Sequence, residues 1–237
     1  MLPPAIFFDL DDTIISYDAG AVPLWKEVCE AYCLQTGEFQ AQQVFEAVIR
    51  TSKWYWSDQE RHRIGRLNLA NARREVVTRA FHELGSDNLA GAHWIADEFS
   101  ARRNASIVIF PDAEATLQDL QRRGVRLALL TNGAAQEQNA KIERFNLRQY
   151  FETILIEGEV GFGKPDERIY RLALARLKLS PEEVWMVGDN LEWDVAAPQT
   201  LGIYSIWHDW RKKGLPDGCG VVPDRIIHNI SELKEVV

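Results

Sequence analysis

Cysteine is scarce in this chain, which has only Cys29, Cys33 and Cys219 among its 237 residues. So few cysteines, and an odd number of them, exclude the disulfide framework of a small secreted domain and are typical of a reducing compartment. Cys29 and Cys33 stand four residues apart in a helical pattern and so share one face. We expect them to be small buried apolar residues, because a metal pair would need two further ligands nearby.

Long apolar runs and targeting signals are also missing. No run approaches the length that a membrane-spanning helix needs. The N-terminal sequence MLPPAIFFDLDD has neither a basic leader nor a small-residue cleavage site, so it does not resemble a signal peptide. We therefore expect a soluble, cytoplasmic protein with no membrane partner.

The chain has no excess of positive charge. Its 27 Lys and Arg against 35 Asp and Glu give a formal charge of −8. Binding of a nucleic acid polymer depends on basic charge spread over a large surface, so we expect no such partner. Hydrophobic residues make up 46% and charged residues 26% of the chain, which excludes a disordered protein and allows a sizeable core.

The sequence has two regions with different hydrophobic patterns, and it contains no internal repeat. Residues 17–104 show helical periodicity with hardly a strand signal; the first helix ends at Gly37, and Ser57 with Glu60 resembles a capping box. Further helices are expected over Asn71–Leu84 and from Ser86 or Asp87 onward. Residues 1–16 and 105–237 instead alternate short apolar runs with amphipathic helices.

These alternating segments predict an α/β fold. The expected strands are Ala5–Phe8, Arg126–Leu130, Thr153–Ile156, Val184–Val187, Ile203–Trp207 and Arg225–Ile227, and the expected helices are Ala113–Arg123, Ala135–Phe145, Glu167–Leu177 and Asn190–Leu201. Apolar strands separated by helices indicate a Rossmann-like parallel sheet covered on both faces. The helical block is then an insertion after the first strand.

Polar residues follow four of the predicted strands. Ligands of such sheets bind at the carboxyl ends of the strands, so these residues should meet in one crevice. They are Asp9, Asp11, Asp12 and Thr13 after the first strand, Thr131, Asn132 and Gly133 after the second, Lys164 beyond the third, and Asp189 and Asp194 beyond the fourth.

Three of these acids, Asp9, Asp11 and Asp189, would repel one another unless a cation joined them. A set of oxygen ligands without histidine or cysteine favours a hard ion, and Mg²⁺ suits a site shared with phosphate oxygens. Lys164 would stand beside an incoming anion, and Thr131 with the following backbone N–H groups could donate to it. A carboxylate facing a neutralised phosphoryl group can attack phosphorus and form an aspartyl phosphate.

The four ordered motifs resemble those of the haloacid dehalogenase superfamily. They are Phe8-Asp9-Leu10-Asp11-Asp12-Thr13, Leu130-Thr131-Asn132-Gly133, Gly163-Lys164-Pro165-Asp166, and Gly188-Asp189 with Asp194. The motifs span nearly the whole chain, and the helical insertion over residues 17–104 is similar to the α-helical C1 cap of that family. Residues 1–16 and 105–237 would form the catalytic core.

The resemblance implies a role for each motif residue. Asp9 would be the nucleophile and a Mg²⁺ ligand, while Asp11 would be the general acid and base and would bind the metal through its backbone carbonyl. Thr131, Asn132 and Lys164 would hold the phosphoryl oxygens. Asp189 would complete the metal site, with Asp194 supporting it from behind or through water.

Other reactions share part of this pattern. A 2-haloacid dehalogenase needs neither Mg²⁺ nor a second acid two residues after the first, so Asp11 and Asp189 favour phosphatase chemistry. A phosphomutase of the same family shares all four motifs. A phospho-Asp signalling domain uses similar groups in another chain order and has no place for the helical insertion.

The substrate is expected to be a small phosphorylated metabolite, a sugar phosphate or a nucleoside monophosphate, bound by a monomer or a homodimer. The motifs look most like the branch of N-acylneuraminate-9-phosphatases and nucleoside 5′-monophosphatases. Residues 50–80 carry eight basic residues against three acidic ones, near Trp54, Tyr55 and Trp56. Among them we select Trp54, Trp56 and Arg61 as candidate substrate contacts, although most of these arginines fit a solvated helix face.

Overall fold

The computed structural model describes residues 1–18 and 20–234, and the chain divides into two compact units. The core unit comprises Met1–Ser16 and the chain from Val108 onward, and the cap unit comprises Tyr17–Ile107. The second boundary lies three residues beyond the expected one, because the last cap helix continues to Ser106.

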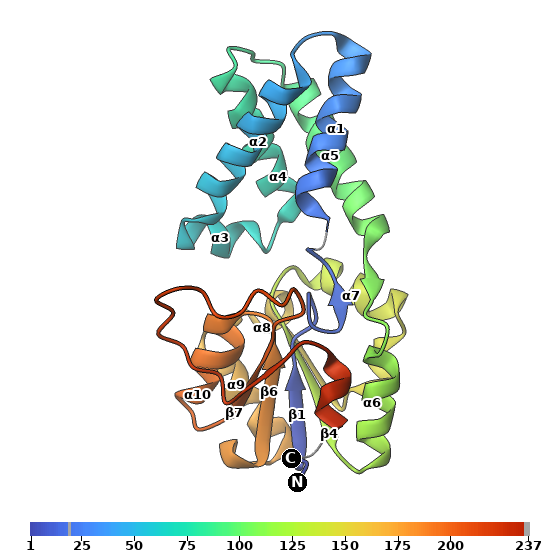
Figure 1. Ribbon diagram of the computed structural model, residues 1–237, viewed down its shortest axis with the longest axis vertical. Helices are drawn as coiled ribbons and strands as arrows, with labels where there is room; N and C mark the ends of the chain where they lie inside the picture. The colour runs from blue at the N-terminus through green and yellow to red at the C-terminus, as the bar shows by residue number, and fades with distance from the viewer. Residues whose placement is uncertain (19, 235–237) are drawn as a thin grey trace. The chain divides into compact units, whose positions relative to one another are not determined.

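The core unit is built on a parallel sheet of six strands (Figure 1). The strands are β1 (Ala5–Phe8), β4 (Arg126–Thr131), β5 (Thr153–Ile156), β6 (Val184–Gly188), β7 (Tyr204–His208) and β8 (Arg225–Ile227). Their spatial order is β5-β4-β1-β6-β7-β8, with every neighbouring pair parallel. The expected Rossmann-like α/β fold is confirmed, and each predicted strand lies within one residue of its expected position.

Helices alternate with these strands. They are α6 (Ala113–Arg122), α7 (Ala135–Arg144), α8 (Glu157–Val160), α9 (Glu167–Leu177) and α10 (Ala197–Gln199), with short turns η1 (Leu147–Tyr150), η2 (Pro181–Glu183) and η4 (Ile230–Lys234). The helix expected over Asn190–Leu201 is instead a π-helical turn, η3 (Leu191–Ala196), followed by α10. The turn at Gly202, which has a positive φ, follows this segment.

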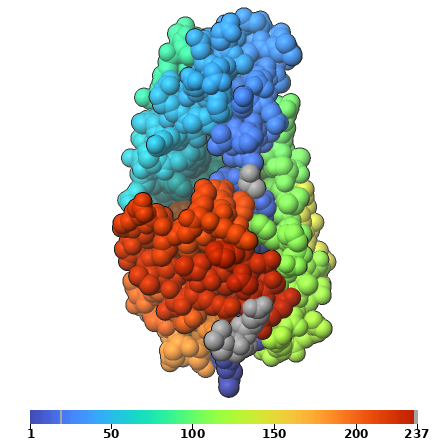
Figure 2. Space-filling view, viewed as in Figure 1, coloured from blue at the N-terminus to red at the C-terminus, as the bar shows by residue number. Residues whose placement is uncertain are grey.

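One face of the sheet packs on α9. Ala5 and Phe7 of β1 alternate with Ile6, so they point to the same side and join Tyr170 and Leu174 of α9 in one buried cluster. In the space-filling view, the C-terminal segment, coloured orange to red, makes up much of the visible surface of this unit (Figure 2).

A small antiparallel ribbon follows the first motif and was not predicted from the sequence. It pairs β2 (Ile15–Ser16) with β3 (Val108–Ile109). Each strand is only two residues long, too short for an alternating pattern to show. This ribbon carries the chain out of and back into the core unit.

The cap unit consists of five helices among the described residues, shown in blue to green in Figure 1. They are α1 (Ala21–Thr36), α2 (Ala41–Trp56), α3 (Gln59–Gly65), α4 (Leu69–Glu83) and α5 (Leu89–Ser106). Gly37 ends α1 with a positive φ of 65°, as its position in the sequence predicted.

One capping prediction in this unit was wrong. Ser57 ends α2, where its hydroxyl donates to the Trp54 carbonyl, and Asp58 caps α3 by accepting from the backbone N–H of Arg61. Aspartate caps helices as well as serine does, so the pattern alone could not choose between the neighbours. The starts of α4 and α5 are likewise set by the caps Asn68 and Asn88.

The cap encloses its own apolar core. Cys29 and Cys33 are buried there as free thiols, as expected, and the ring of Trp25 stacks on that of Phe99 with centroids 3.6 Å apart. None of the described helices is long and apolar enough to span a bilayer.

Candidate active site

Asp9 and Lys164 form the buried centre of the strand-end site. The peptide N–H of Asp9 donates to Val187 of the neighbouring strand β6, which continues the sheet by one residue. Lys164 Nζ donates to Asp9 Oδ1 at 2.7 Å and to Asp194 Oδ1 at 2.5 Å. Lys164 is only 1% exposed. Burial alone would lower the pKa of this ammonium, but the Asp194 and Asp9 carboxylates outweigh it and raise the pKa, so Lys164 is a cation.

Three carboxylates gather around this lysine. Asp9, Asp189 and Asp194 each offer an oxygen within 4.8 Å of the others. Burial, opposed in part by Lys164, raises the pKa of Asp9 to about 7. Burial and then the charge of Asp9 also raise the pKa of Asp189. One ammonium among three crowded acids leaves negative charge uncompensated, so the donor set fits a hard divalent cation.

The loop after β6 places two of these acids. The indole N–H of Trp207 donates to the Asp189 carbonyl at 2.8 Å, and the peptide N–H of Asn190 donates to Asp194 Oδ2 at 3.0 Å. Gly188 makes the approach possible, because a Cβ there would lie 2.2 Å from Cγ of Asp194. Asp194 therefore lies directly against the strand end instead of facing solvent.

Asn132 joins the loop after β4 to the lysine loop. Its side-chain amide donates to the Lys164 carbonyl at 2.7 Å, and its Oδ1 accepts from the Lys164 peptide N–H at 2.8 Å. A Cβ on Gly163 would lie 2.5 Å from this Oδ1. The side chain of Asn132 thus holds two loops together.

Asp11 lies apart from the acid cluster and faces α7. Lys141 Nζ donates to both carboxylate oxygens of Asp11 at 2.9 Å, and Gln138 Nε2 donates to Asp11 Oδ2 at 3.0 Å. Gln138 also donates to Thr131 Oγ1 at 2.5 Å. Neither α7 residue was predicted to belong to the site. In the sequence, their spacing of three residues was the signal available, and the same spacing also fits an ordinary helix face.

Asp12 and His208 complete the first loop from the other side. Asp12 is buried with a positive φ of 59°, and its carbonyl accepts from His208 Nδ1 at 3.1 Å. Burial lowers the pKa of His208, which favours the neutral ring. This contact with a backbone carbonyl supports the strained turn.

The three candidate substrate contacts of the cap lie within that unit. The guanidinium groups of Arg61 and Arg79 each lie 4.0 Å from the Trp54 ring centroid, and Arg61 Nη2 donates to the Trp54 carbonyl at 2.9 Å. The Trp56 ring contacts Tyr55 and His62 edge-on. Substrate contact by these residues stays a prediction.

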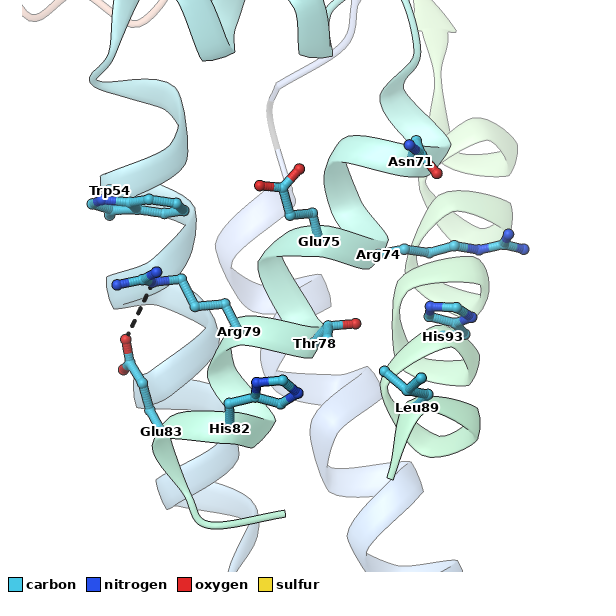
Figure 3. A pocket seen from close by; sticks show the side chains of 10 residues that line it. All are labelled: Trp54, Asn71, Arg74, Glu75, Thr78, Arg79, His82, Glu83, Leu89 and His93. Carbon is cyan, nitrogen blue, oxygen red and sulfur yellow. Dashed lines mark ion pairs between the residues drawn. The ribbon is translucent and has the colours of Figure 1, made fainter. Parts of the chain in front are cut away.

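Trp54 also borders a surface hollow of about 730 Å³ between α2, α4 and α5 (Figure 3). Its charged side chains are mostly paired: Arg79 with Glu83 at 3.6 Å, and Arg74 with Asp97 outside the hollow at 2.6 Å. Paired charges on an open surface give little attraction for a further ion.

Comparison with known proteins identifies the family. Residues 3–202 match the model of haloacid dehalogenase-like hydrolases. A phosphoserine phosphatase of Thermus thermophilus is 38% identical over 69% of this chain, and the chain spans only 63% of that relative's length. The N-acylneuraminate-9-phosphatase of Rattus norvegicus is 28% identical over 98% of this chain and 93% of its own length.

Solved structures share the architecture. The putative HAD-hydrolase YfnB from Bacillus subtilis, bound to magnesium, superposes with a TM-score of 0.73 at 19% identity, covering 99% of this chain and 98% of that one. A 2-haloacid dehalogenase from Pseudomonas syringae gives 0.62 at 26% identity, covering 99% and 97%. With the family model matched over residues 3–202, the chain belongs to the haloacid dehalogenase-like hydrolases.

Proposed function

We propose that the protein is a Mg²⁺-dependent phosphatase that hydrolyses a small phosphomonoester through an aspartyl phosphate on Asp9. The observation that carries the proposal is the pairing of a buried carboxylate with the buried ammonium of Lys164, 2.7 Å away, at the carboxyl end of β1. A carboxylate beside a fixed positive charge is suited to attack on an anionic phosphoryl group.

The reaction would proceed in two displacements. In the first, an Asp9 carboxylate oxygen attacks phosphorus, the bond from phosphorus to the ester oxygen breaks, and Asp11 gives its proton to the leaving alcohol. In the second, Asp11 takes a proton from water, the resulting hydroxide attacks phosphorus, and the bond to Asp9 breaks to release phosphate. Asp11 is suited to both steps because its side chain is 25% exposed and so open to solvent.

Three residues would hold the phosphoryl oxygens. Thr131 is the last residue of β4 and Asn132 follows it, and two hydrogen bonds join Asn132 to the loop that carries Lys164. These donors are fixed before the substrate arrives, so they stabilise charge on the transferring group without reorganising.

The metal would be held by carboxylate oxygens of Asp9 and Asp189 and by the backbone carbonyl of Asp11. Asp194, which is 1% exposed and bound to Lys164, would position these ligands without binding the ion directly, or would bind it through a water molecule. The ion would neutralise phosphoryl charge and orient the phosphate against Asp9.

The substrate class proposed is a sugar phosphate or a nucleoside monophosphate. Relatives named as phosphatases of small metabolites support it, and one of them is the N-acylneuraminate-9-phosphatase described above. These relatives are named for different substrates, so no single one of them supplies the substrate of this chain. The monomer or homodimer state and the cytoplasmic location stay predictions.

Dehalogenation is the main competing activity, since dehalogenases are among the structural neighbours. Two residues favour phosphorus chemistry: Asp11, which is a second acid beside the nucleophile, and Asp189, which joins the acid cluster. A phosphomutase would use the same residues with a second alcohol in place of water.

The decisive variant is Asp9→Asn. We expect it to lower hydrolysis of a generic aryl phosphate by on the order of 10⁴-fold or more, because the nucleophile is lost while the fold stays intact. Excess EDTA should abolish wild-type turnover and added Mg²⁺ should restore it. Asp97→Asn, which removes a surface acid of the cap, serves as the matched control with unchanged turnover.

Unchanged turnover in Asp9→Asn would refute the nucleophile, and full activity in excess EDTA would refute the metal. Release of halide from a 2-haloacid without phosphatase activity would replace the proposal with dehalogenation. Transfer of phosphate to an added sugar faster than to water would replace it with a mutase.

A further inference from the structure

The carboxylate of Asp11 is bound on the α7 side of the site. Both of its oxygens accept from Lys141 Nζ at 2.9 Å, and Oδ2 accepts from Gln138 as well. Among residues 1–18 and 20–234, the acids that approach one another closely enough to share an ion are Asp9, Asp189 and Asp194, without Asp11. The two acids of the first motif therefore point to different partners.

The partners on α7 are buried and fixed. Lys141 is 9% exposed and Gln138 2%. They stand three residues apart and so lie on one face of the helix, directly after the motif that carries Thr131. Besides Asp11, Gln138 Nε2 reaches Thr131 Oγ1 and the Asn132 carbonyl, at 2.5 and 2.7 Å. The ammonium of Lys141 and the amide of Gln138 hold this carboxylate on the α7 side through hydrogen bonds that its negative charge strengthens.

These contacts of Asp11 matter because a bound cation would compete for the same carboxylate. A divalent cation at Asp9 and Asp189 would attract any nearby carboxylate, and Asp11 is only two residues from Asp9. A carboxylate bound to the cation would be held at the ion and could not reach the leaving oxygen or the attacking water to exchange a proton. The positive charge of Lys141 competes with the cation for Asp11.

The geometry points to Lys141 and Gln138 as positioning residues that keep the Asp11 carboxylate off the metal and free for proton transfer. The inference rests on the proposed function, since it concerns the metal and the proton donor of that reaction. In this role Lys141 acts through its contact with Asp11.

The inference is tested by a double-mutant cycle of the full chain with Asp11→Asn, Lys141→Met and both together. The first readout is the Mg²⁺ concentration at half-maximal thermal stabilisation, measured without substrate. Lys141→Met frees Asp11 to join the ion, so the half-maximal concentration should fall about tenfold. In the Asp11→Asn background the same substitution should change it by less than about twofold, within the error of additive effects.

The control for charge alone is Arg144→Met, which removes one positive charge from the same helix at an exposed position. It should leave Mg²⁺ binding unchanged. If Lys141→Met tightens binding equally with and without Asp11, the effect is long-range electrostatics and the inference is wrong. If Lys141→Met weakens binding or leaves it unchanged, Lys141 does not hold Asp11 off the ion and the inference is equally wrong.

The second readout is the dependence on the leaving group. kcat/KM of Lys141→Met should fall about 10- to 100-fold for an alkyl phosphate, whose alcohol needs a proton, and less than about threefold for p-nitrophenyl phosphate, whose phenolate does not. Equal losses on both substrates would overturn the inference. Gln138→Leu keeps the charge of Lys141 and should also lower kcat/KM more for the alkyl phosphate than for p-nitrophenyl phosphate, by a smaller factor. It provides the test if Lys141→Met does not fold.

Failure of the proposed function is recognised separately. Wild-type protein that hydrolyses neither phosphate, or whose stability does not respond to Mg²⁺, contradicts the phosphatase itself. Wild-type protein that passes both tests, with variants that show no coupling between Lys141 and Asp11, contradicts only the positioning role.

Discussion

The core and the cap place their charged side chains differently. In the core, Lys164 and Asp194 are each 1% exposed and bind each other among further acids. In the cap, pairs such as Arg74 with Asp97 lie at the surface, with side chains 42% and 47% exposed. Burying charge is costly, so an unfavourable cluster in the core indicates function, whereas the surface pairs of the cap mainly keep its helices hydrated.

Two cap arginines depart from this contrast. Arg73 donates to Ser100 and to the Tyr17 hydroxyl, and Arg103 donates to Asp18; both arginines are buried. Tyr17 and Asp18 begin the cap after the β2 strand, so these arginines fix the first residues of the cap to its own helices. Their burial has a structural explanation that the core cluster lacks.

The largest expected effect concerns Lys164. Lys164→Met leaves Asp9 and Asp194 as buried carboxylates without their cation, and breaking such a pair costs about 3–5 kcal/mol. Chemical denaturation in EDTA should show this loss in the free energy of unfolding, with Mg²⁺ restoring part of it. A loss below about 1 kcal/mol would mean that the buried ammonium contributes as little as a surface charge.

Two glycines allow a matched test of the contrast. A Cβ on Gly188 would lie 2.2 Å from Asp194 Cγ, and a Cβ on Gly65 would lie 2.7 Å from Tyr55 Cε1. Both alanine variants overpack and should lose about 1–3 kcal/mol of stability. Gly188→Ala should also abolish Mg²⁺-dependent stabilisation and turnover, whereas Gly65→Ala should retain both. Loss of turnover in Gly65→Ala but not in Gly188→Ala would contradict the placement of the site in the core.

Arg61 tests whether the cap contributes to substrate binding. Removing the hydrogen bond to the Trp54 carbonyl should cost about 1 kcal/mol of stability. If Arg61 contacts substrate, as predicted from the sequence, Arg61→Ala should also raise KM for the preferred metabolite more than for p-nitrophenyl phosphate. An equal change in KM for both substrates would mean that Arg61 has only its structural contact with Trp54.

The smallest effect is expected for Asp97. Hydrogen bonds from Arg74 lower the pKa of this carboxyl below its ordinary value of 3.8. Its contribution is therefore present above that value and is lost as the pH falls through the lowered pKa. Asp97→Asn should lower Tm by no more than about 2 °C at pH 7, with the difference from wild type shrinking as the pH falls through the lowered pKa. A difference that grows on acidification would contradict the sign of the shift.

The sequence predicted the sheet and the motif loops because strand and strand-end signals are local. Ala5–Phe8 is wholly apolar and is followed at once by Asp9, and the parallel topology brings the ends together without further information. Gln138 and Lys141 were missed because each also fits an ordinary helix face. Their part in the site depends on a contact with Asp11 more than 120 residues away.

The cap unit was harder to predict in detail from the sequence. Its helices were expected, but whether Ser57 or Asp58 caps the start of α3 depends on which side chain meets the free N–H groups of that helix. The stacking of Arg61 and Arg79 on Trp54 depends in the same way on how α2, α3 and α4 pack, which the sequence does not state.

Rapid acid quenching during turnover of p-nitrophenyl phosphate, whose leaving group needs no proton from Asp11, tests the central claim most directly. The protein is then digested, and the phosphorylated peptide is located by mass spectrometry. The account predicts one phosphoryl group on Asp9 in the wild type, a larger amount in Asp11→Asn, where water is no longer activated, and none in Asp9→Asn. Continued hydrolysis with no phosphoryl group on the protein, or with the group on a residue other than Asp9, would contradict it.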